Sequence, residues 1–219
     1  MLEELSYMSD EQKKIEFWAV RHGETEENRR GIIQGQGVGT LSSYGLRQMA
    51  LAAECLYRVD FNAIYSSDLS RAMESALIIQ AAGHAKCEIQ SNWSLREWHL
   101  GVLEGLTRDE CAARYPEVWE AVCTPSVNAE VPGGESRLAL YGRVHDFLGK
   151  MVAKHQPGER ILLVTHGGVM RMLLRMIVGE LRPGNSDGAV ANGSIARFNY
   201  CPATQSWQLI AWNSTEHLE

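Results

Sequence analysis

Two histidines follow apolar segments of the chain in the same way, each directly before a glycine. His22 lies in Arg21-His22-Gly23 after the apolar run 15–20, and His166 lies before Gly167 after the run 161–164. An imidazole can act as a nucleophile, as an acid or base, or as a metal ligand. An arginine adds a planar fork of donors with a fixed positive charge. The pattern therefore indicates chemistry on an anionic group, provided that the two histidines meet in the folded chain.

A third apolar segment places another arginine in a comparable position. We expect a strand at 62–65, followed by a helix that runs to Gly83 with Asp68 or Ser70 as its cap. Arg71 then lies in the first turn of this helix, close to the end of the strand. The helix N-terminus adds unpaired N–H groups and the positive end of the helix dipole.

The ends of these three strands are expected at one edge of a parallel sheet, where ligands of α/β proteins bind. Arg21, His22, Arg71 and His166 would then lie together and suit a dianionic phosphoryl group. The neighbouring cations would keep the imidazole of His22 neutral and nucleophilic. A metal site is the rival use of two histidines. It is disfavoured because arginines repel a cation and no Asp or Cys nearby completes a ligand set, so we predict no metal and no cofactor.

Strands and helices alternate along the chain, which predicts an α/β three-layer sandwich with a mainly parallel central sheet flanked by helices. We expect residues 1–14 as a flexible extension and 15–213 as a single domain, with 91–133 as a lid-like insertion over the C-terminal strand ends. The expected strands are 15–20, 62–65, 86–90, 161–164, 194–200 and 207–212, and the expected helices are 43–58, 70–83, 138–152 and 169–179.

The composition limits the partners of the chain. The 219 residues carry 21 Lys and Arg against 27 Asp and Glu, a net charge of −6, with 45% hydrophobic residues. This is the composition of an ordinary globular protein, and its acidic balance argues against nucleic-acid and membrane-surface partners. We therefore expect a small phosphorylated metabolite as the partner, bound by a few local positive groups. The oligomeric state stays open, with a homodimer as one alternative.

The five cysteines are widely spaced and form no C-x-x-C pattern. They predict reduced, mostly buried thiols and a cytoplasmic protein, without a disulfide framework or zinc knuckle. The first 14 residues lack the apolar stretch of a signal peptide, and no apolar run has the length of a membrane span.

The sequence resembles the histidine phosphatase superfamily, which includes the cofactor-dependent phosphoglycerate mutases. The main motif is Arg21-His22-Gly23-Glu24-Thr25, followed by Asn28. The further matches, in the order of the family, are SSDLSRAMESA (66–76), LREWHLGVLEGLT (95–107), PGGES (132–136) and VTHGGVMRMLL (164–174). The resemblance covers residues 15–200, nearly the whole chain.

The resemblance implies a role for each residue of the motifs. His22 resembles the nucleophile that forms a phosphohistidine. Arg21, Arg71 and His166, with Gly167 beside it, resemble the clamp on the phosphoryl oxygens. Covalent catalysis of this kind splits one difficult displacement into two easier ones.

Other positions resemble groups that assist this chemistry. Glu97 resembles the general acid that protonates the leaving oxygen, with Glu104 as the reserve candidate. Asn28 and Gln34 lie where the family places further phosphate or substrate contacts. The carbonyl of Gly23 is expected to fix the tautomer of His22.

The segment after the nucleophile departs from the family. Many members carry G-Q-x-D-x-P-L-T there, whereas Val38 takes the acidic place and Thr40 the proline place here. Four glycines lie in this loop, at 31, 35, 37 and 39. The loop is either a flexible surface connection or a part of the substrate mouth, so the specificity of the family is not carried over.

Three functions are compatible with these residues. The leading hypothesis is a metal-independent phosphomonoester hydrolase that acts on a small metabolite. The alternative is a phosphoglycerate mutase, in which the phosphoryl group returns to the substrate instead of water; the short interval between Trp98 and Pro132 favours the phosphatase. A catalytically idle binding module would have lost a core residue, and all of them are present.

Overall fold

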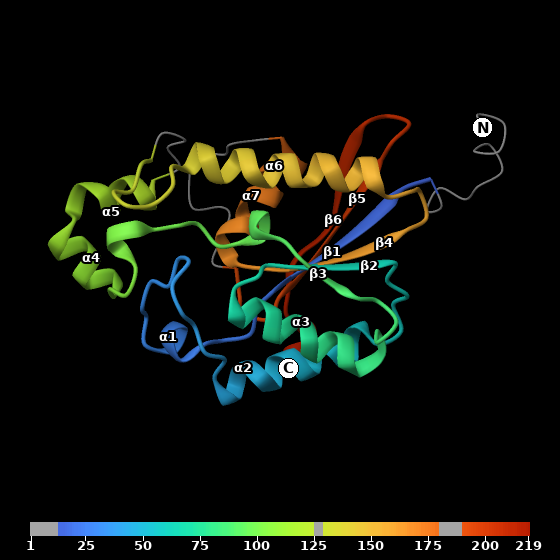
Figure 1. Cartoon of the computed structure of the whole chain (residues 1–219), viewed down its shortest axis with the longest axis horizontal. Coiled ribbons are helices and arrows are strands. Elements are labelled where there is room, and N and C mark those ends of the chain that lie inside the picture. Colours follow the sequence, from blue (N-terminus) through green and yellow to red (C-terminus); the bar gives the residue numbers. More distant parts are fainter. Residues whose placement is uncertain (1–12, 125–128, 180–189) are drawn as a thin grey trace.

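A six-stranded sheet forms the centre of the molecule (Figure 1). The computed structural model describes residues 13–124, 129–179 and 190–219. The strand order is β3-β2-β4-β1-β5-β6. The bounds are β1 (Ile15–Arg21), β2 (Ala63–Ser66), β3 (Ile89–Ser91), β4 (Arg160–Thr165), β5 (Ile195–Cys201) and β6 (Ser206–Ser214). The first four strands run parallel, whereas β5 is antiparallel to β1 and β6 is antiparallel to β5, which confirms the mainly parallel sheet.

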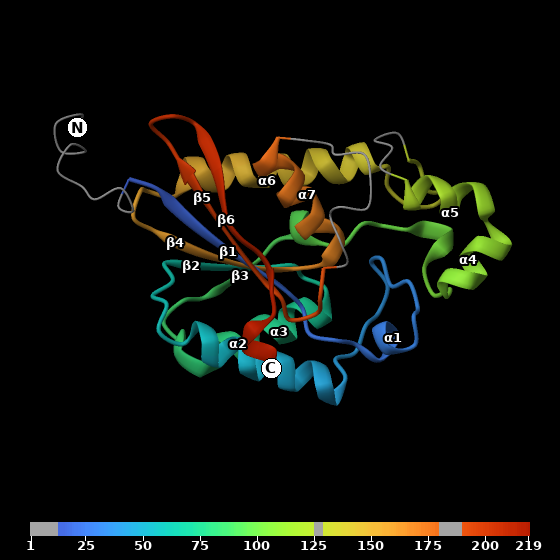
Figure 2. The ribbon, with the colours of Figure 1, turned by 180° about the vertical axis from the view of Figure 1, so that it is seen from behind.

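Helices cover both faces of the sheet and complete the predicted three layers (Figures 1 and 2). On one face lie α6 (Arg137–Lys154) and α7 (Gly167–Val178), and on the other lie α2 (Ser43–Leu56) and α3 (Ser70–Gly83). The short 3-10 helix η5 (Glu216–Leu218) near the C-terminus packs against α2. Figure 2 shows this end of the chain beside α2 and α3.

Alternate residues of the central strands serve two separate cores. In β1, Phe17 belongs to the same buried cluster as Phe147 of α6, whereas Val20 belongs to the cluster of Met49 in α2. In β4, Leu163 and Leu162 divide between the two clusters in the same way. Because successive side chains of a strand point to opposite faces, a sheet covered on both faces needs strands that are apolar throughout. The apolar runs 17–20 in β1 and 161–164 in β4 meet this need.

The segment between β3 and α6 carries short helices to one end of the molecule (Figure 1). It contains η2 (Trp93–Leu95), η3 (Gly101–Leu103), α4 (Arg108–Arg114) and α5 (Pro116–Cys123). The lid role expected for 91–133 stays a prediction, and residues 125–128 of this stretch lie outside the described residues. Residues 1–12 of the expected N-terminal extension lie outside them as well.

The predicted cap of α3 is wrong. The N-cap residue is Leu69, without a side-chain hydrogen bond, and Ser70 is the first residue of the helix. The carboxylate of Asp68 instead accepts two hydrogen bonds from the guanidinium of Arg96, at 2.7 and 2.6 Å. Asp68 therefore does not cap the helix, because its carboxylate is held in a charge-assisted pair with Arg96, which is distant in the sequence.

Most other expected boundaries differ from the observed ones by one or two residues, and three differences are informative. The helix expected at 169 begins at Gly167, and the strand expected at 86–90 is confined to β3. The segment between His22 and the glycine-rich loop, for which the sequence predicts no helix, contains the short helix α1 (Glu26–Arg29). Thr25 and Asn28 form a capping box around its first turn, in which each side chain accepts a hydrogen bond from the backbone of the other.

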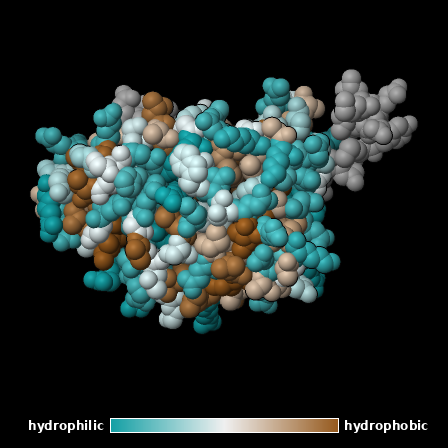
Figure 3. Space-filling model, in the orientation of Figure 1, coloured by the Kyte–Doolittle hydropathy of each residue, from teal (hydrophilic) through white to brown (hydrophobic). Residues whose placement is uncertain are grey.

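The surface seen in Figure 3 is mostly hydrophilic, with apolar patches over α3 and over the region of α4 and α5. Among the residues that the structure describes, no helix combines the length and the apolar character that crossing a membrane requires.

Candidate active site

The ends of β1, β2 and β4 are level with one another, and the two histidines follow two of them. Arg21 pairs with Thr165 in the register of β1 and β4, and Ser66 pairs with Val164. The imidazole rings of His22 and His166 therefore lie side by side, with their centroids 5.1 Å apart. Both side chains are buried, His22 at 2% exposure and His166 at 0%.

The backbone fixes the tautomer of His22 in the way the sequence predicts. Nδ1 of His22 lies 2.7 Å from the carbonyl oxygen of Gly23. A carbonyl can only accept, so Nδ1 carries the proton, and Nε2 of the neutral ring keeps its lone pair. The amide of Asn192 donates to the same carbonyl at 3.3 Å and to that of His22 at 3.1 Å. Asn192 thus holds the nucleophile in place, and no sequence pattern singled it out.

Both rings are held in the neutral form. Burial lowers the pKa of His22 well below its usual value of 6.5, and the charges of Arg21 and Arg71 lower it further. Burial likewise lowers the pKa of His166, with Arg71 as the next largest cause. A neutral imidazole has the free lone pair that a nucleophile needs. The same buried cations that would bind a phosphoryl group therefore keep His22 reactive.

His166 is oriented by a serine at the end of β2. Nε2 of His166 lies 2.8 Å from Oγ of Ser67, which also accepts the backbone N–H of Leu69. The hydroxyl proton of Ser67 is then available to Nε2, and this leaves Nδ1 of His166 as the N–H donor. The Ser67 side chain was missed at the sequence level, although SSDLSR was among the matching segments.

Three buried nitrogen atoms at this edge of the sheet lack a hydrogen-bond partner within the described part of the chain. They are Nε of Arg21, Nε of Arg71 and Nδ1 of His166. Buried polar groups in folded proteins are almost always paired, so unpaired donors that converge require an explanation. Each is a donor, and together they surround His22. The arrangement suits an anion with several oxygen atoms placed against Nε2 of His22.

The glycine-rich loop holds one of these donors in place. Nη2 of Arg71 donates to the carbonyl of Gly35 at 2.7 Å, and Nη1 donates to that of Gly37 at 2.9 Å. The loop is itself fixed by Glu104, whose Oε1 accepts the backbone N–H of Gln36 at 2.9 Å. The interpretation as a mere flexible connection is therefore wrong, because the loop carbonyls orient the guanidinium of Arg71.

The Gly35→Ala substitution tests this role of the loop. Gly35 has a φ of +49°, and a Cβ there would collide with the carboxylate of Glu104. Gly31 has a φ of +72° but open space around its Cβ position, so Gly31→Ala is the matched control. Both variants should lose about 1–2 kcal/mol of stability from the backbone conformation. Only Gly35→Ala should also lose phosphatase kcat/KM, by about tenfold or more. Equal activity in the two variants would contradict a positioning role.

The carboxylate of Glu97 contacts the first turn of α7, which follows His166. Its Oε2 accepts the N–H of Gly168 at 3.0 Å, and its Oε1 accepts the N–H of Trp98 at 2.8 Å. Its charge acts on both Arg21 and Arg71. A Cβ at Gly168 would collide with this carboxylate, which explains the second glycine of the motif. Glu97 is therefore close enough to the clamp to act electrostatically on both arginines, and its role as the general acid stays a prediction.

The reserve candidate, Glu104, is committed to the backbone. Its Oε1 accepts the N–H groups of Leu100 at 2.8 Å and of Gln36 at 2.9 Å. Its carboxylate thereby joins the start of η3 to the glycine-rich loop and holds the two segments together. Both carboxylates accept backbone N–H groups, but Glu97 acts electrostatically on Arg21 and Arg71, whereas Glu104 acts on Arg71 alone of these two arginines, so Glu97 stays the preferred candidate for the acid.

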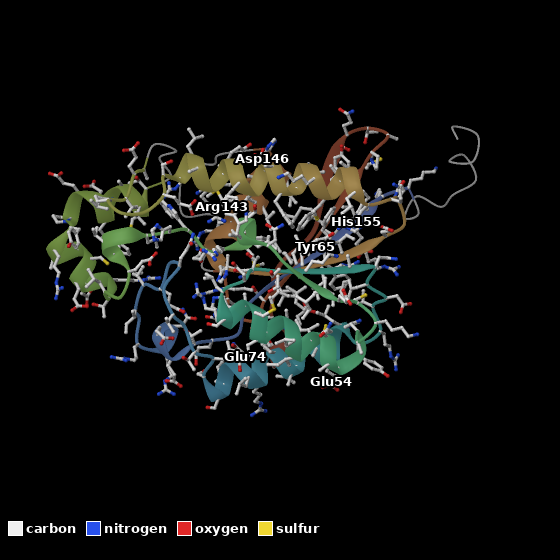
Figure 4. The ribbon with its side chains drawn as sticks, in the orientation of Figure 1. Glu54, Tyr65, Glu74, Arg143, Asp146 and His155 are labelled. Carbon is white, nitrogen blue, oxygen red and sulfur yellow. The ribbon has the colours of Figure 1, made fainter. Side chains whose placement is uncertain are left out.

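Arg143 of α6 supports the turn that carries Glu97. Arg143 lies on the side of α6 that faces the sheet, whereas Asp146 lies on the opposite side of the helix (Figure 4). Its guanidinium donates to the carbonyls of Arg96 and Glu97 at 2.7 and 2.9 Å. It also pairs with Glu135, with 2.5 Å between Nη2 and Oε1. Helical periodicity predicts the apolar face of α6 but gives no sign that an arginine is buried in it.

The remaining predicted residues take different places around the site. Oδ1 of Asn28 accepts from Nδ2 of Asn192 at 3.1 Å, so it is joined to the backbone of the nucleophile. Gln34 is 9% exposed, and its Oε1 has no partner within the described ranges. Gly167 begins α7 with its Cβ position 3.4 Å from Nε of Arg21. The substrate contacts of Asn28 and Gln34 stay predictions.

Within residues 13–124, 129–179 and 190–219, no three His, Cys, Asp or Glu side chains form a group that could hold a metal ion.

Comparison with known proteins agrees with the motifs. A model of the histidine phosphatase superfamily (branch 1) matches residues 17–215. Phosphoglycerate mutase-like protein 4 of Arabidopsis thaliana is 36% identical over 220 residues, covering 100% of this chain and 93% of that protein. The metal-independent phosphoserine phosphatase of the same plant is 37% identical over 210 residues, covering 95% of this chain and 85% of that protein.

The fold agrees with solved structures. The structure of a mycobacterial glucosyl-3-phosphoglycerate phosphatase with VO3 has a TM-score of 0.81 and 29% identity, and covers 91% of this chain and 99% of that one. The resemblance read from the motifs is therefore confirmed along nearly the whole length, and the chain belongs to branch 1 of the histidine phosphatase superfamily.

Proposed function

We propose that the protein is a metal-independent phosphatase that hydrolyses a small phosphomonoester through a phosphohistidine at His22. The observation that carries the proposal is the convergence of unpaired buried donors from Arg21, Arg71 and His166 around a neutral His22. The names of two relatives, a metal-independent phosphoserine phosphatase and a glucosyl-3-phosphoglycerate phosphatase, support hydrolysis.

In the first step, Nε2 of His22 attacks the phosphorus atom. The N–P bond forms, the bond to the ester oxygen breaks, and protonated Glu97 gives its proton to the leaving oxygen. Arg21, Arg71 and His166 donate to the phosphoryl oxygens, whose charge they stabilise throughout. The carbonyl of Gly23 accepts from Nδ1 and stabilises the ring as it becomes positively charged.

In the second step, water replaces the histidine. The Glu97 carboxylate accepts a proton from the water molecule while its oxygen attacks phosphorus. The N–P bond breaks, inorganic phosphate leaves, and His22 returns to the neutral form. The cycle is closed in protons, since Glu97 regains the one that it gave to the leaving group.

A phosphoglycerate mutase is the second candidate. It would use the same first step and return the phosphoryl group to a hydroxyl of the substrate instead of water. The identity to phosphoglycerate mutase-like protein 4 supports it. The two candidates differ only in the acceptor, so they are separated by the product.

The experiment that decides is a product assay on purified protein. We expect inorganic phosphate from O-phosphoserine, 3-phosphoglycerate or p-nitrophenyl phosphate, with undiminished rates in a strong chelator. Conversion of 3-phosphoglycerate to 2-phosphoglycerate faster than phosphate release would instead establish the mutase. Loss of activity in the chelator that added metal restores would contradict the metal-independent mechanism.

A further inference from the structure

A row of arginines extends from the phosphoryl clamp along α7. Gly167, Arg171 and Arg175 are four residues apart, so they share one face of the helix. This face begins at the clamp, because a Cβ at Gly167 would lie 3.4 Å from Nε of Arg21. The side chains of a helix tilt toward its N-terminus. Arg171 therefore leans from the second turn back toward Arg21.

The electrostatics place Arg171 among other cations. Burial lowers the pKa of Arg21 to about 10; Glu97 opposes this shift, and Arg171 adds to it. Burial also lowers the pKa of Arg137 at the start of α6 to about 10, with Arg175 and Arg171 as the next causes. Arg171 is thus close enough to act on both Arg21 and Arg137. The repulsion that Arg171 adds to these two arginines would be relieved by an anion bound beside it.

Arg171 has no such anion among the described residues. It is half-buried, and the structure gives it no hydrogen bond or ion pair with residues 13–124, 129–179 or 190–219. The nearby carboxylate of Glu97 is already engaged with the backbone N–H groups of Gly168 and Trp98. A half-buried cation without a partner in the described part of the chain, beside a site proposed to bind an anionic substrate, points to a group of the substrate.

This group is not the phosphoryl group itself. The phosphoryl position is set by Nε2 of His22 and the donors at the strand ends, whereas Arg171 lies one helical turn along α7, about 5.4 Å further. A second anionic group a few bonds away from the ester oxygen would reach it. A carboxylate matches the planar fork of a guanidinium with two parallel hydrogen bonds.

We propose that Arg171 is a specificity-determining residue that binds a carboxylate of the substrate, so that phosphorylated carboxylic acids are preferred over phosphomonoesters that lack a carboxylate. This rests on the proposed phosphatase function. Arg171 acts on binding and takes no part in the transfer of the phosphoryl group. Its loss should therefore raise KM for such acids more than it lowers kcat.

Matched substrates test the proposal in the full chain. 3-Phosphoglycerate and glycerol 3-phosphate differ only in the carboxylate, and so do O-phosphoserine and O-phosphoethanolamine. The unmodified protein should favour the acid of each pair in kcat/KM by about tenfold or more. Arg171→Gln should lower kcat/KM for both acids by about 10–100-fold and leave p-nitrophenyl phosphate and the two esters without a carboxylate unchanged, whereas Arg171→Lys should retain part of the preference.

Controls separate this inference from the proposed function. Arg160→Gln removes an exposed arginine at the opposite end of β4 and should leave every ratio unchanged. Equal loss on all substrates in Arg171→Gln, or an unchanged preference for the acids, would overturn the role of Arg171. A selective loss on sugar bisphosphates, with the acids unaffected, would overturn it in favour of a second phosphate. Failure of the unmodified protein to release phosphate from any of these esters would contradict the phosphatase function itself.

Discussion

The His22→Ala variant should lose phosphatase activity by at least about 10⁴-fold on every phosphomonoester, because it removes the atom that forms the covalent bond to phosphorus. The measurement is the release of phosphate from O-phosphoserine and of nitrophenol from p-nitrophenyl phosphate. The substitution should not disturb the packing of the apolar core, because the ring of His22 contacts His166 in the clamp. Thermal unfolding should therefore show an intact fold.

His145→Ala is the control for the loss of a histidine. His145 lies on α6 with its side chain 64% exposed, and its removal should leave kcat/KM unchanged. Retention of activity in His22→Ala within about tenfold of the unmodified protein would contradict the mechanism.

The Glu97→Gln variant should show a loss that depends on the leaving group. Glutamine keeps the shape of the side chain but cannot give a proton to the leaving oxygen. Hydrolysis of O-phosphoserine, whose alkoxide leaves poorly, should fall by about 10²–10⁴-fold. Hydrolysis of p-nitrophenyl phosphate, whose phenolate leaves well without protonation, should fall by less than about tenfold in the first step. Burst kinetics isolate this step from the attack of water.

Glu104→Gln is the matched control for this second prediction. Glu104 holds the glycine-rich loop and the N–H of Leu100, so its loss should affect both substrates by the same factor. A dependence on the leaving group in Glu104→Gln and none in Glu97→Gln would assign the acid to Glu104.

The sequence predicts the sheet and the place of the clamp because both follow from local patterns. A strand buried on both faces contains a run of apolar residues, as at 17–20 in β1 and 161–164 in β4. The residues that follow parallel strands must meet at one edge. The placement of Arg21, His22 and His166 at this edge follows from these two patterns alone. Arg71 followed from the same argument, although its predicted helix cap was wrong.

The supporting residues could not be predicted because their roles arise from contacts between distant segments. Asn192 holds the backbone of the nucleophile from 170 residues away in the chain, and Arg143 holds the turn of Glu97 from the middle of a helix. The carboxylate of Asp68 binds Arg96 instead of capping the helix. A glycine-rich loop looks the same in sequence whether it is free or fixed, and the contact between Gly35 and Arg71 decides which.

The most direct test of the central claim is to trap the covalent intermediate. The protein is mixed rapidly with ³²P-labelled p-nitrophenyl phosphate, quenched in denaturant, and the labelled peptide is mapped. The account predicts one phosphoryl group on His22 that is stable in alkali and lost in acid, and no label in His22→Ala. A label stable in acid, or one on a serine or carboxylate, would contradict it.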